Sequence, residues 1–380
     1  MDEPEEPSVL LVAEQLRRRV PGGIGTHARG LLQGLRQLGD AGEGVDVTIL
    51  ASRAPRRGGG DELEGMGWPL RTSRLPGRAL TRAWDHRWLH APSGFRVVHS
   101  VSMAAPLPER AGRSRLVVTV HDLAWRRHPD ATTSRGARWH EAALARARRA
   151  GADVVVPSRY VAADAVAAGI EEARVTVAQS GADHLPSPDA TGAAVLLERI
   201  GVTGEFLLTV GTLEPRKNLG RLARAHRAVR ASLPEPWPLV VVGPSGWGER
   251  DDMPPPSEDV RFTGPVPSAV LAGLYQRARA FAYVPLSEGA GLPPLEALWM
   301  GTPTVVSTEV PSVYDLGASG PPPALRVDPL EVDEIAQGLV TVLTDDVTRA
   351  DLSARGSHYA HERTWQRVAR THLTLWRSLR

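Results

Sequence analysis

Short apolar runs rich in Val, Leu and Ile, separated by helical stretches, restrict the fold of this 380-residue chain more than any other feature. Such runs, which are apolar without alternation, are typical of strands buried on both faces of a parallel sheet. They recur along the whole chain, at 8–13, 96–100, 115–120, 152–156, 174–178, 206–210, 239–242, 280–284 and 304–306. Because helical segments such as 31–38, 135–149 and 159–169 lie between them, the sequence predicts an α/β fold with doubly wound parallel sheets.

The length predicts two domains, because single hydrophobic cores rarely grow beyond about 250–300 residues. A stretch with prolines and glycine at 184–195 has the composition of an interdomain linker. We therefore predict an N-terminal domain over residues 8–185 and a C-terminal domain over residues 186–358. Residues 359–380 are predicted to form a helix with an apolar stripe, either returning to the first domain or simply packing on a core.

The acidic, proline-rich start of the chain, residues 1–7, is predicted to be a disordered tail, since it lacks the basic start and apolar centre of a signal peptide. No apolar run approaches the roughly 20 residues that span a bilayer. The absence of cysteine excludes disulfides, thiol catalysis and thiolate metal sites. The absence of cysteine does not decide the compartment. The lack of a signal peptide and of a membrane-spanning run predicts a cytoplasmic protein, with a peripheral position at the inner face of the membrane as the alternative.

Arginine is unevenly distributed, with an excess of eleven arginine residues over aspartate and glutamate between residues 51 and 160. A basic face of this kind attracts an anionic acceptor or the inner face of an anionic membrane. An arginine-rich composition also produces such an excess without any role. The sequence leaves both interpretations open.

Residues 287–307 combine a glycine-rich loop, a short helix and a strand. Pro293 suits the first helical turn, and Gly301 is placed to end the helix before the next strand. The backbone N–H groups that gather at the helix start favour negative charge, so this stretch predicts a phosphate site. Those N–H groups belong to Gly289, Ala290, Gly291 and Leu292.

Glu296 is predicted to lie in the first turn of this helix, where a carboxylate would repel a phosphate. It either complements the helix dipole or accepts two hydrogen bonds from the vicinal hydroxyl groups of a ribose. The residue alone does not decide between these roles.

Lys217 is the only lysine among 45 basic residues. It lies in the loop 211–220, which follows the predicted strand 206–210. A chain that otherwise uses arginine suggests that a compact ammonium group is required here, although a chance occurrence is the alternative.

His121 follows the predicted strand 115–120 and therefore lies at a carboxyl end, where open α/β sheets bind ligands. Gly23 and Gly25 fit part of the dinucleotide fingerprint. However, Gly23 lies about ten residues beyond its strand, and the strand near 45–51 is not followed by the ribose-binding acid. These features argue against an NAD enzyme.

Taken together, residues 22–30, 116–130, 211–220 and 287–307 resemble the family 4 glycosyltransferases of group 1, particularly the mannosyltransferases. The resemblance extends over nearly the whole chain. It implies the GT-B fold, in which two Rossmann-like domains face each other across a cleft, and a retaining mechanism.

The resemblance also implies roles for individual residues. Glu288 and His121 would contact the donor sugar, Glu296 the ribose, and Lys217 with Arg216 the diphosphate. The remaining donor-binding positions implied are backbone or loop positions, namely Gly23, Ile24, Gly25, Gly211, Thr212, Val266, Gly289, Ala290, Gly291 and Leu292.

The predicted function is transfer of a hexose from a nucleoside diphosphate sugar to a glycan, lipid-linked or small-molecule acceptor. GDP-mannose is favoured over UDP-glucose and UDP-N-acetylglucosamine. No cofactor or metal is expected, because the chain has no Asp-x-Asp motif and no thiolate, and no nucleic acid is expected as a partner. The alternatives are a sugar nucleotide epimerase or phosphorylase on the same fold, or a catalytically silent nucleotide-sugar-binding protein.

Overall fold

The computed structural model describes residues 6–44, 46–54, 61–109, 114–129, 132–230, 233, 235–246, 257, 259–314 and 321–379. The chain divides into two compact units. Unit 1 comprises Met1–Ser180 and Trp365–Arg380, and unit 2 comprises Gly181–Thr364. The predicted boundaries, 185/186 and 358/359, therefore differ from the observed divisions. The backbone N–H of Ala182 donates to the carbonyl of Arg363 at 2.8 Å, which joins both connecting segments within unit 2.

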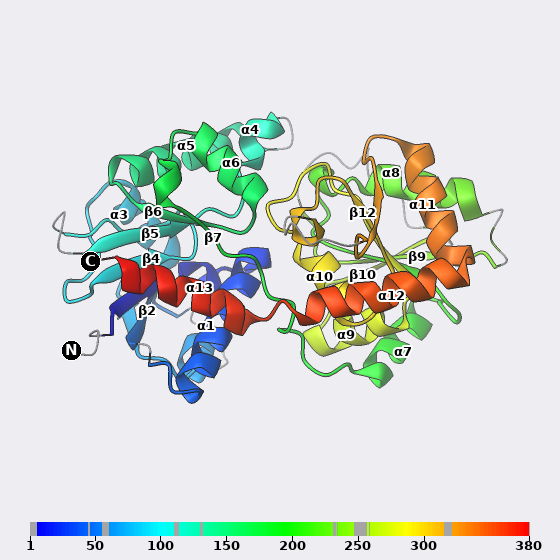
Figure 1. Cartoon of the computed structure of the whole chain (residues 1–380), viewed down its shortest axis with the longest axis horizontal. Helices are drawn as coiled ribbons and strands as arrows, with labels where there is room; N and C mark the ends of the chain where they lie inside the picture. Colours follow the sequence, from blue (N-terminus) through cyan, green and yellow to red (C-terminus); the bar gives the residue numbers. More distant parts are fainter. Residues whose placement is uncertain are drawn as a thin grey trace. The chain divides into compact units, whose positions relative to one another are not determined.

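Both ends of the chain lie on unit 1 (Figure 1). The predicted disordered tail over residues 1–7 is wrong for its last two residues. Pro7 is buried, and Arg377 Nη2 donates to Glu6 Oε1 at 2.8 Å. The rest of that prediction, residues 1–5, lies outside the described residues.

Unit 1 is built on a seven-stranded sheet in the order β3-β2-β1-β4-β5-β6-β7, with every neighbouring pair parallel. The strands are β1 Ser8–Val12, β2 Asp46–Ser52, β3 Leu70–Ser73, β4 Val97–Ser100, β5 Arg115–Thr119, β6 Asp153–Val156 and β7 Val175–Val177. The helices are η1 Glu14–Arg17, α1 Gly22–Asp40, α2 Glu62–Gly65, α3 Gly77–Asp85, α4 Ala124–Arg127, α5 Ser134–Arg149, α6 Arg159–Ala167, η3 Glu172–Arg174 and α13 Trp365–Ser378. The strand order reverses direction between β1 and β4, which makes this the switch point of the sheet.

Unit 2 is built on a six-stranded parallel sheet in the order β10-β9-β8-β11-β12-β13. The strands are β8 Leu207–Val210, β9 Leu239–Val242, β10 Val260–Gly264, β11 Ala280–Tyr283, β12 Thr304–Ser307 and β13 Leu325–Val327. The helices are α7 Ala190–Arg199, η4 Pro215–Lys217, α8 Leu219–Arg230, α9 Ser268–Arg277, α10 Leu292–Trp299, η6 Pro311–Val313, α11 Val332–Thr344 and α12 Asp346–His361. Here the switch point lies between β8 and β11. Two doubly wound parallel sheets confirm the predicted α/β fold of the GT-B type.

The apolar runs are explained by cores on both faces of each sheet. In unit 2, Val240 of β9 packs in one buried cluster, whereas its neighbours Leu239 and Val241 pack in another. Successive side chains of a strand point to opposite faces, so a strand covered on both sides must be apolar at every position.

The predicted terminal helix over 359–379 is wrong as a single helix. Helix α12 ends at His361, and α13 begins at Trp365 in unit 1. The carbonyl of Arg363, between the two helices, accepts from Ala182 instead of continuing a helical pattern. Helix α13 then packs along α1 (Figure 1), where a Cβ on Gly30 would lie 2.1 Å from the Trp365 ring. Glycine on α1 therefore allows the tryptophan to approach the helix backbone.

Candidate functional site

Helix α10 begins directly after the glycine-rich loop that follows β11 in unit 2. Gly291 precedes the helix with a φ of 92°, and a Cβ there would lie 2.7 Å from Val310. Both the left-handed backbone and the close neighbour require glycine. Pro293 lies in the first turn, and Gly301, with a φ of 75°, follows the helix end. The predicted loop, helix and strand are therefore present, with the proline in the first helical turn and the glycine after the helix end as expected.

The loop is held by Ser312 of η6. Its backbone N–H donates to the carbonyl of Ala290 at 3.0 Å, and its Oγ donates to the carbonyl of Gly291 at 2.8 Å. The hydroxyl of Tyr359 donates in turn to the carbonyl of Ser312 at 2.7 Å. The path from Gly289 through Leu292 into the helix is therefore fixed by the protein's own contacts.

Glu296 is the fifth residue of α10, and no acidic residue lies in the first turn. The prediction of a first-turn position is wrong, and the dipole role that depended on it loses its basis. The residue is 7% exposed. His184 Nε2 donates to Oε1 at 2.9 Å, and the Tyr275 hydroxyl donates to Oε2 at 2.8 Å. Both carboxylate oxygens are oriented by side chains that the sequence analysis did not identify.

Glu288 lies in the loop before α10 and is 8% exposed. Its Oε1 accepts hydrogen bonds from Lys217 Nζ, from Arg216 Nη1 at 3.0 Å and from the Tyr283 hydroxyl at 2.7 Å. Burial by itself would raise the pKa of Glu288, but the charges of Arg216 and Lys217 outweigh it and lower the pKa to about 2. Glu288 is therefore a carboxylate at every physiological pH.

Lys217 ends the 3-10 helix η4 and is directed into this buried cluster. Its Nζ donates to the Tyr283 hydroxyl at 2.7 Å as well as to Glu288, and it lies 5.2 Å from the centroid of the Tyr283 ring. Gly211 faces the lysine stem, since a Cβ there would lie 3.6 Å from Cδ and Cε. The next residue, Asn218, has a φ of 58° and donates through Nδ2 to the carbonyl oxygens of Val284 and Pro329. The only lysine is thus a half-buried group whose ammonium is oriented by two hydrogen bonds.

Arg216 is the second cation of the cluster and contacts both of its carboxylates. Its Nη1 also donates to the carbonyl of Ser287 at 2.7 Å, and its Nη2 donates to Glu214 Oε1 at 2.8 Å. Two cations, Arg216 and Lys217, therefore face two carboxylates, Glu214 and Glu288. The arrangement is formally neutral and is able to exchange one carboxylate partner for an added anion.

These groups follow the carboxyl ends of β8 and β11, the two strands at the switch point of unit 2. Gly211 and Thr212 come directly after β8. A Cβ on Gly243, after β9, would lie 2.0 Å from the Gly211 carbonyl oxygen, so the loops after β8 and β9 are packed backbone to backbone. Val266 follows β10 and is partly buried against the core. The predicted unit 2 residues therefore share the edge where parallel sheets bind ligands.

In unit 1, the predicted glycine loop is wrong in its local structure. Helix α1 begins at Gly22, well before the predicted start at residue 31, so Gly23, Ile24 and Gly25 form its first turn. The N–H of Gly25 donates to the carbonyl of Pro21 at 3.2 Å, and a Cβ on Gly25 would lie 2.2 Å from Pro21 Cβ. The glycines therefore allow the helix to begin directly against a proline.

His121 follows the carboxyl end of β5, as predicted. Its Nε2 donates to the Val101 carbonyl, beyond β4, at 2.8 Å, so the neutral ring carries its proton on Nε2 and leaves Nδ1 as an acceptor. Burial lowers the pKa of His121, against the opposing effects of that hydrogen bond and of Asp122. Asp122 itself accepts from the N–H of Ala124 at 3.1 Å, which fixes the start of α4.

His121 is one end of a histidine row formed by His121, His27, His372 and His99 of unit 1. Successive ring centroids in this row are 5.0, 6.0 and 5.3 Å apart. Both ring nitrogens of His27, which is 2% exposed, and Nε2 of His372 are buried without a hydrogen-bond partner. The four residues come from α1, α13, β4 and the end of β5, so their proximity was not visible in the sequence.

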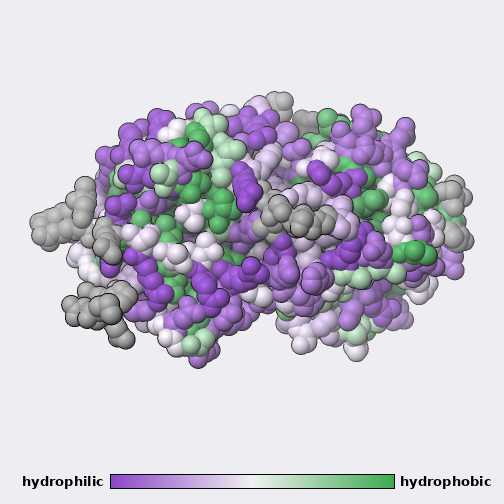
Figure 2. Space-filling model, in the orientation of Figure 1, coloured by the Kyte–Doolittle hydropathy of each residue, from purple (hydrophilic) through white to green (hydrophobic). Residues whose placement is uncertain are grey.

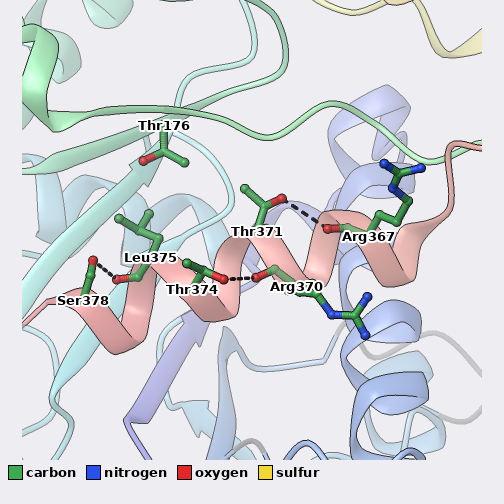
Figure 3. Close-up of a pocket in the computed structure, with 7 residues that line it drawn as sticks. All are labelled: Thr176, Arg367, Arg370, Thr371, Thr374, Leu375 and Ser378. Carbon is green, nitrogen blue, oxygen red and sulfur yellow. Dashed lines mark hydrogen bonds between the residues drawn. The ribbon is translucent and has the colours of Figure 1, made fainter. Parts of the chain in front are cut away.

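A separate groove of about 670 Å³ lies on unit 1 between β7 and α13 (Figure 3). The hydroxyl groups of α13 in this groove bond to their own helix, as Thr371 Oγ1 donates to the Arg367 carbonyl and Thr374 Oγ1 to the Arg370 carbonyl. The guanidinium of Arg370 donates to Glu43 at 2.6 Å. These side chains are therefore already bonded within unit 1, and the groove does not extend the site.

The face drawn in Figure 2 is largely hydrophilic, with hydrophobic side chains in separate patches. Within the described part of the chain, no helix has both the length and the apolar character needed to cross a bilayer. Among those same residues, no three His, Asp or Glu side chains are arranged to hold a metal ion. The expectation of a metal-free reaction stays a prediction.

Two family models match this chain. Residues 21–184 match the model described as Glycosyltransferase Family 4, and residues 204–345 match Glycosyl transferases group 1. One match covers most of each unit, although the first begins after β1, and together they include every predicted site residue.

The chain is also similar to curated proteins. It is 33% identical over 197 residues to the O-antigen chain mannosyltransferase B of Escherichia coli, an alignment that covers 48% of this chain and 49% of that protein. The phosphatidyl-myo-inositol mannosyltransferase of Mycolicibacterium smegmatis is 27% identical over 92% of this chain and 88% of its own length. The chain spans about half the length of the first relative and 22% of the serotype-specific mannosyltransferase WbdA of Escherichia coli.

Among solved structures, the Anabaena protein HepE in complex with UDP and glucose superposes with a TM-score of 0.70 at 16% identity, over 97% of this chain and 99% of that one. At this identity the likeness concerns the fold alone.

Proposed function

The chain belongs to the group 1 glycosyltransferases of family 4, and from this premise we propose that it transfers a hexose from a nucleoside diphosphate sugar to an acceptor hydroxyl group with retention of configuration. The observation that carries the proposal is the balanced cluster of Arg216, Lys217, Glu214 and Glu288 at the switch point of unit 2. A half-buried cluster of this kind, next to a helix start with a glycine-rich loop, suits an anionic ligand that also carries hydroxyl groups.

The chemistry follows from an exchange of partners. An incoming diphosphate attracts Lys217 and Arg216, and their release from Glu288 frees that carboxylate to accept hydrogen bonds from the sugar. As the bond between the anomeric carbon and the diphosphate oxygen breaks, the leaving group gains negative charge. The acceptor hydroxyl oxygen bonds to the anomeric carbon on the same face, and its proton passes to the leaving diphosphate. The two cations and the N–H groups before α10 stabilise that charge in a buried site, where such interactions are strongest. For His121 of unit 1, Nδ1 is the ring nitrogen that can accept a hydrogen bond from a sugar hydroxyl group.

GDP-mannose is the proposed donor, and the mannosyltransferase names of two relatives support it. A solved relative in fold contains UDP-glucose, which keeps UDP-sugars as the competing donors. The acceptor is proposed to be a glycan or a lipid-linked sugar. Neither a metal nor a cofactor takes part in the proposed reaction.

The test is to incubate the protein with GDP-mannose, UDP-glucose or UDP-N-acetylglucosamine and to measure release of the nucleoside diphosphate, with Glu288→Gln as the matched variant. Release that is fastest from GDP-mannose and falls in Glu288→Gln is expected. Preferential release from a UDP-sugar would replace the proposed donor. An isomerised nucleotide sugar without free diphosphate would indicate an epimerase, and binding without any release would indicate a silent binding protein.

We also propose that unit 1 contacts an anionic membrane surface through the segment around α3. Trp88 and Leu89 are 68% and 40% exposed, and the side chains of Arg78, Arg82 and Arg87 are exposed beside them. Exposed tryptophan together with arginine is the combination found at membrane interfaces.

Sedimentation with vesicles provides the test. Binding to vesicles that contain phosphatidylserine, but not to pure phosphatidylcholine, is expected for the wild type, with a loss in Trp88→Ala. Leu330→Ala removes another exposed apolar side chain, from unit 2, and serves as the control. Equal binding by Trp88→Ala would contradict this surface.

A further inference from the structure

We propose that Tyr275 and His184 are positioning residues for Glu296, and that they make the donor site selective for a ribonucleotide over its 2′-deoxy counterpart. The inference rests on the proposed function, because it assigns the partner of Glu296 to the ribose of a nucleotide donor. It concerns residues on α9 and on the segment that enters unit 2, outside every motif found in the sequence.

The hydrogen bonds of Glu296 leave two of its acceptor lone pairs unused. A carboxylate offers about four lone pairs, two on each oxygen. His184 Nε2 uses one lone pair on Oε1 at 2.9 Å, and the Tyr275 hydroxyl uses one on Oε2 at 2.8 Å. One lone pair remains on each oxygen, which is the acceptor pattern that two vicinal hydroxyl groups require. A single hydroxyl would fill only half of it.

The Tyr275 hydroxyl is held rigidly and donates in one direction. Its ring is fully buried and packs edge to face on Phe281 with centroids 5.4 Å apart. Its backbone carbonyl accepts from Thr302 Oγ1 at 2.7 Å, which anchors the end of α9. Burial, reinforced by the nearby Glu296 charge, raises the pKa of Tyr275 well above its usual value, so the phenol keeps its proton.

Without that hydroxyl, only His184 holds the carboxylate of Glu296, and its terminal torsion gains freedom, because such sp³–sp² torsions have broad minima. A rotating carboxylate still attracts one ribose hydroxyl but no longer presents both acceptors at the spacing of a diol. Loss of the Tyr275 hydroxyl is therefore expected to reduce the preference for ribose over 2′-deoxyribose more than it reduces the affinity for the nucleotide. A merely structural role of Tyr275 would lower stability and leave that discrimination unchanged.

The experiment measures the dissociation constants of GDP, UDP and their 2′-deoxy forms by calorimetry, for the wild type, Tyr275→Phe and His184→Ala. The wild type is expected to prefer the ribonucleotide about tenfold, the effect of one hydrogen bond to a charged group. In Tyr275→Phe the preference is expected to fall at least threefold. Tyr283→Phe is the matched control, because it removes the equivalent hydroxyl from Glu288, and its ring also packs on Phe281.

The outcomes distinguish a failure of the inference from a failure of the proposed function. A reduced preference in Tyr275→Phe, with the wild-type preference kept in Tyr283→Phe, supports the inference. An unchanged preference in a folded Tyr275→Phe protein overturns the inference alone. If Tyr275→Phe does not fold, His184→Ala decides on the same measure. A wild type that binds neither GDP nor UDP overturns the proposed function, and the inference with it.

Discussion

The two units use the same sheet topology but place opposite kinds of side chain at its carboxyl edge. In unit 2, two carboxylates are paired with two cations, and a third carboxylate is held by a histidine and a tyrosine. In unit 1, the corresponding region contains the histidine row of uncharged imidazoles. The difference shows that the fold provides a position for a ligand, whereas the side chains decide whether that position receives charge or excludes it.

The largest expected effect follows from the different response of the two units to acid. Burial lowers the pKa of His27, His99 and His372, the last to about 4, so the unfolded chain binds more protons below about pH 6.5. Stability is therefore lost as pH falls through 6.5, by about 1.4 kcal/mol per imidazole and pH unit. For three residues this amounts to about 4 kcal/mol at pH 5.5.

Glu288 shows the same sign, because its pKa is also lowered, but its stability effect lies in a lower pH window. Its pKa is lowered to about 2, so the stability that it contributes is present above its unfolded value and is lost only as pH falls from about 4.5 towards 2. Hydrogen exchange of the full chain at pH 7.5 and 5.5, corrected for intrinsic rates, is expected to show the larger loss of protection in α1 and α13. A smaller loss is expected in α8 of unit 2, where burial also lowers the pKa of His226. His27→Phe, which removes one titrating ring, should reduce the loss in α1 and α13. Equal losses in both units would contradict the comparison.

The second prediction concerns Lys217 of unit 2. Lys217→Arg keeps the charge but places a wide planar fork where a compact ammonium fits between Glu288 and Tyr283. A displacement on the order of 1 Å costs about a hundredfold in rate. We expect Lys217→Arg to lose about that much turnover while it still binds the donor measurably, and Lys217→Ala to lose both. Arg224→Lys on the exposed face of α8 is the control. A Lys217→Arg enzyme with wild-type turnover would show that lysine is not required at this position.

The sequence predicted the local features of the fold, and it failed where distant segments meet. The limits of α10 followed from Gly291, Pro293 and Gly301, because backbone restrictions act within a few residues. The break between α12 and α13 was missed, since it depends on a hydrogen bond from Ala182, far away in the sequence.

The candidate site shows the same division. Glu288 and Lys217 were each proposed as ligand groups, but their pairing with each other is a tertiary contact. Tyr275 and Tyr283 were missed because a tyrosine within an apolar run is ordinarily predicted to be a core residue. One signal was present, since the chain has only five tyrosines and two of them donate to the two glutamates of the motif. The rarity of a residue type, used for Lys217, could have been applied to tyrosine as well.

The third prediction tests the unit 1 side of the comparison. His121→Ala removes a neutral imidazole whose proton is committed to Val101, and it is expected to lower turnover about tenfold, the effect of one lost hydrogen bond, with little change in donor affinity. Steady-state kinetics with separate measurement of donor binding would show the split, and His358→Ala on exposed α12 is the control. Turnover near that of the wild type would show that His121 takes no part in the reaction.

The smallest expected effect is that of a chelator, and it tests how unit 2 handles charge. If Lys217, Arg216 and the start of α10 alone compensate the diphosphate, excess EDTA should leave the rate of nucleoside diphosphate release within about twofold of the untreated protein, because backbone dipoles and fixed cations supply the potential. The measurement is best made on wild type and Lys217→Ala together. If Mg²⁺ partly restores the variant but does not affect the wild type, then a divalent cation can replace the ammonium, which would support an electrostatic role for Lys217. Loss of wild-type activity with EDTA and recovery with Mg²⁺ or Mn²⁺ would instead mean that the cationic cluster is insufficient, and that the charge balance inferred for unit 2 omits a metal ion.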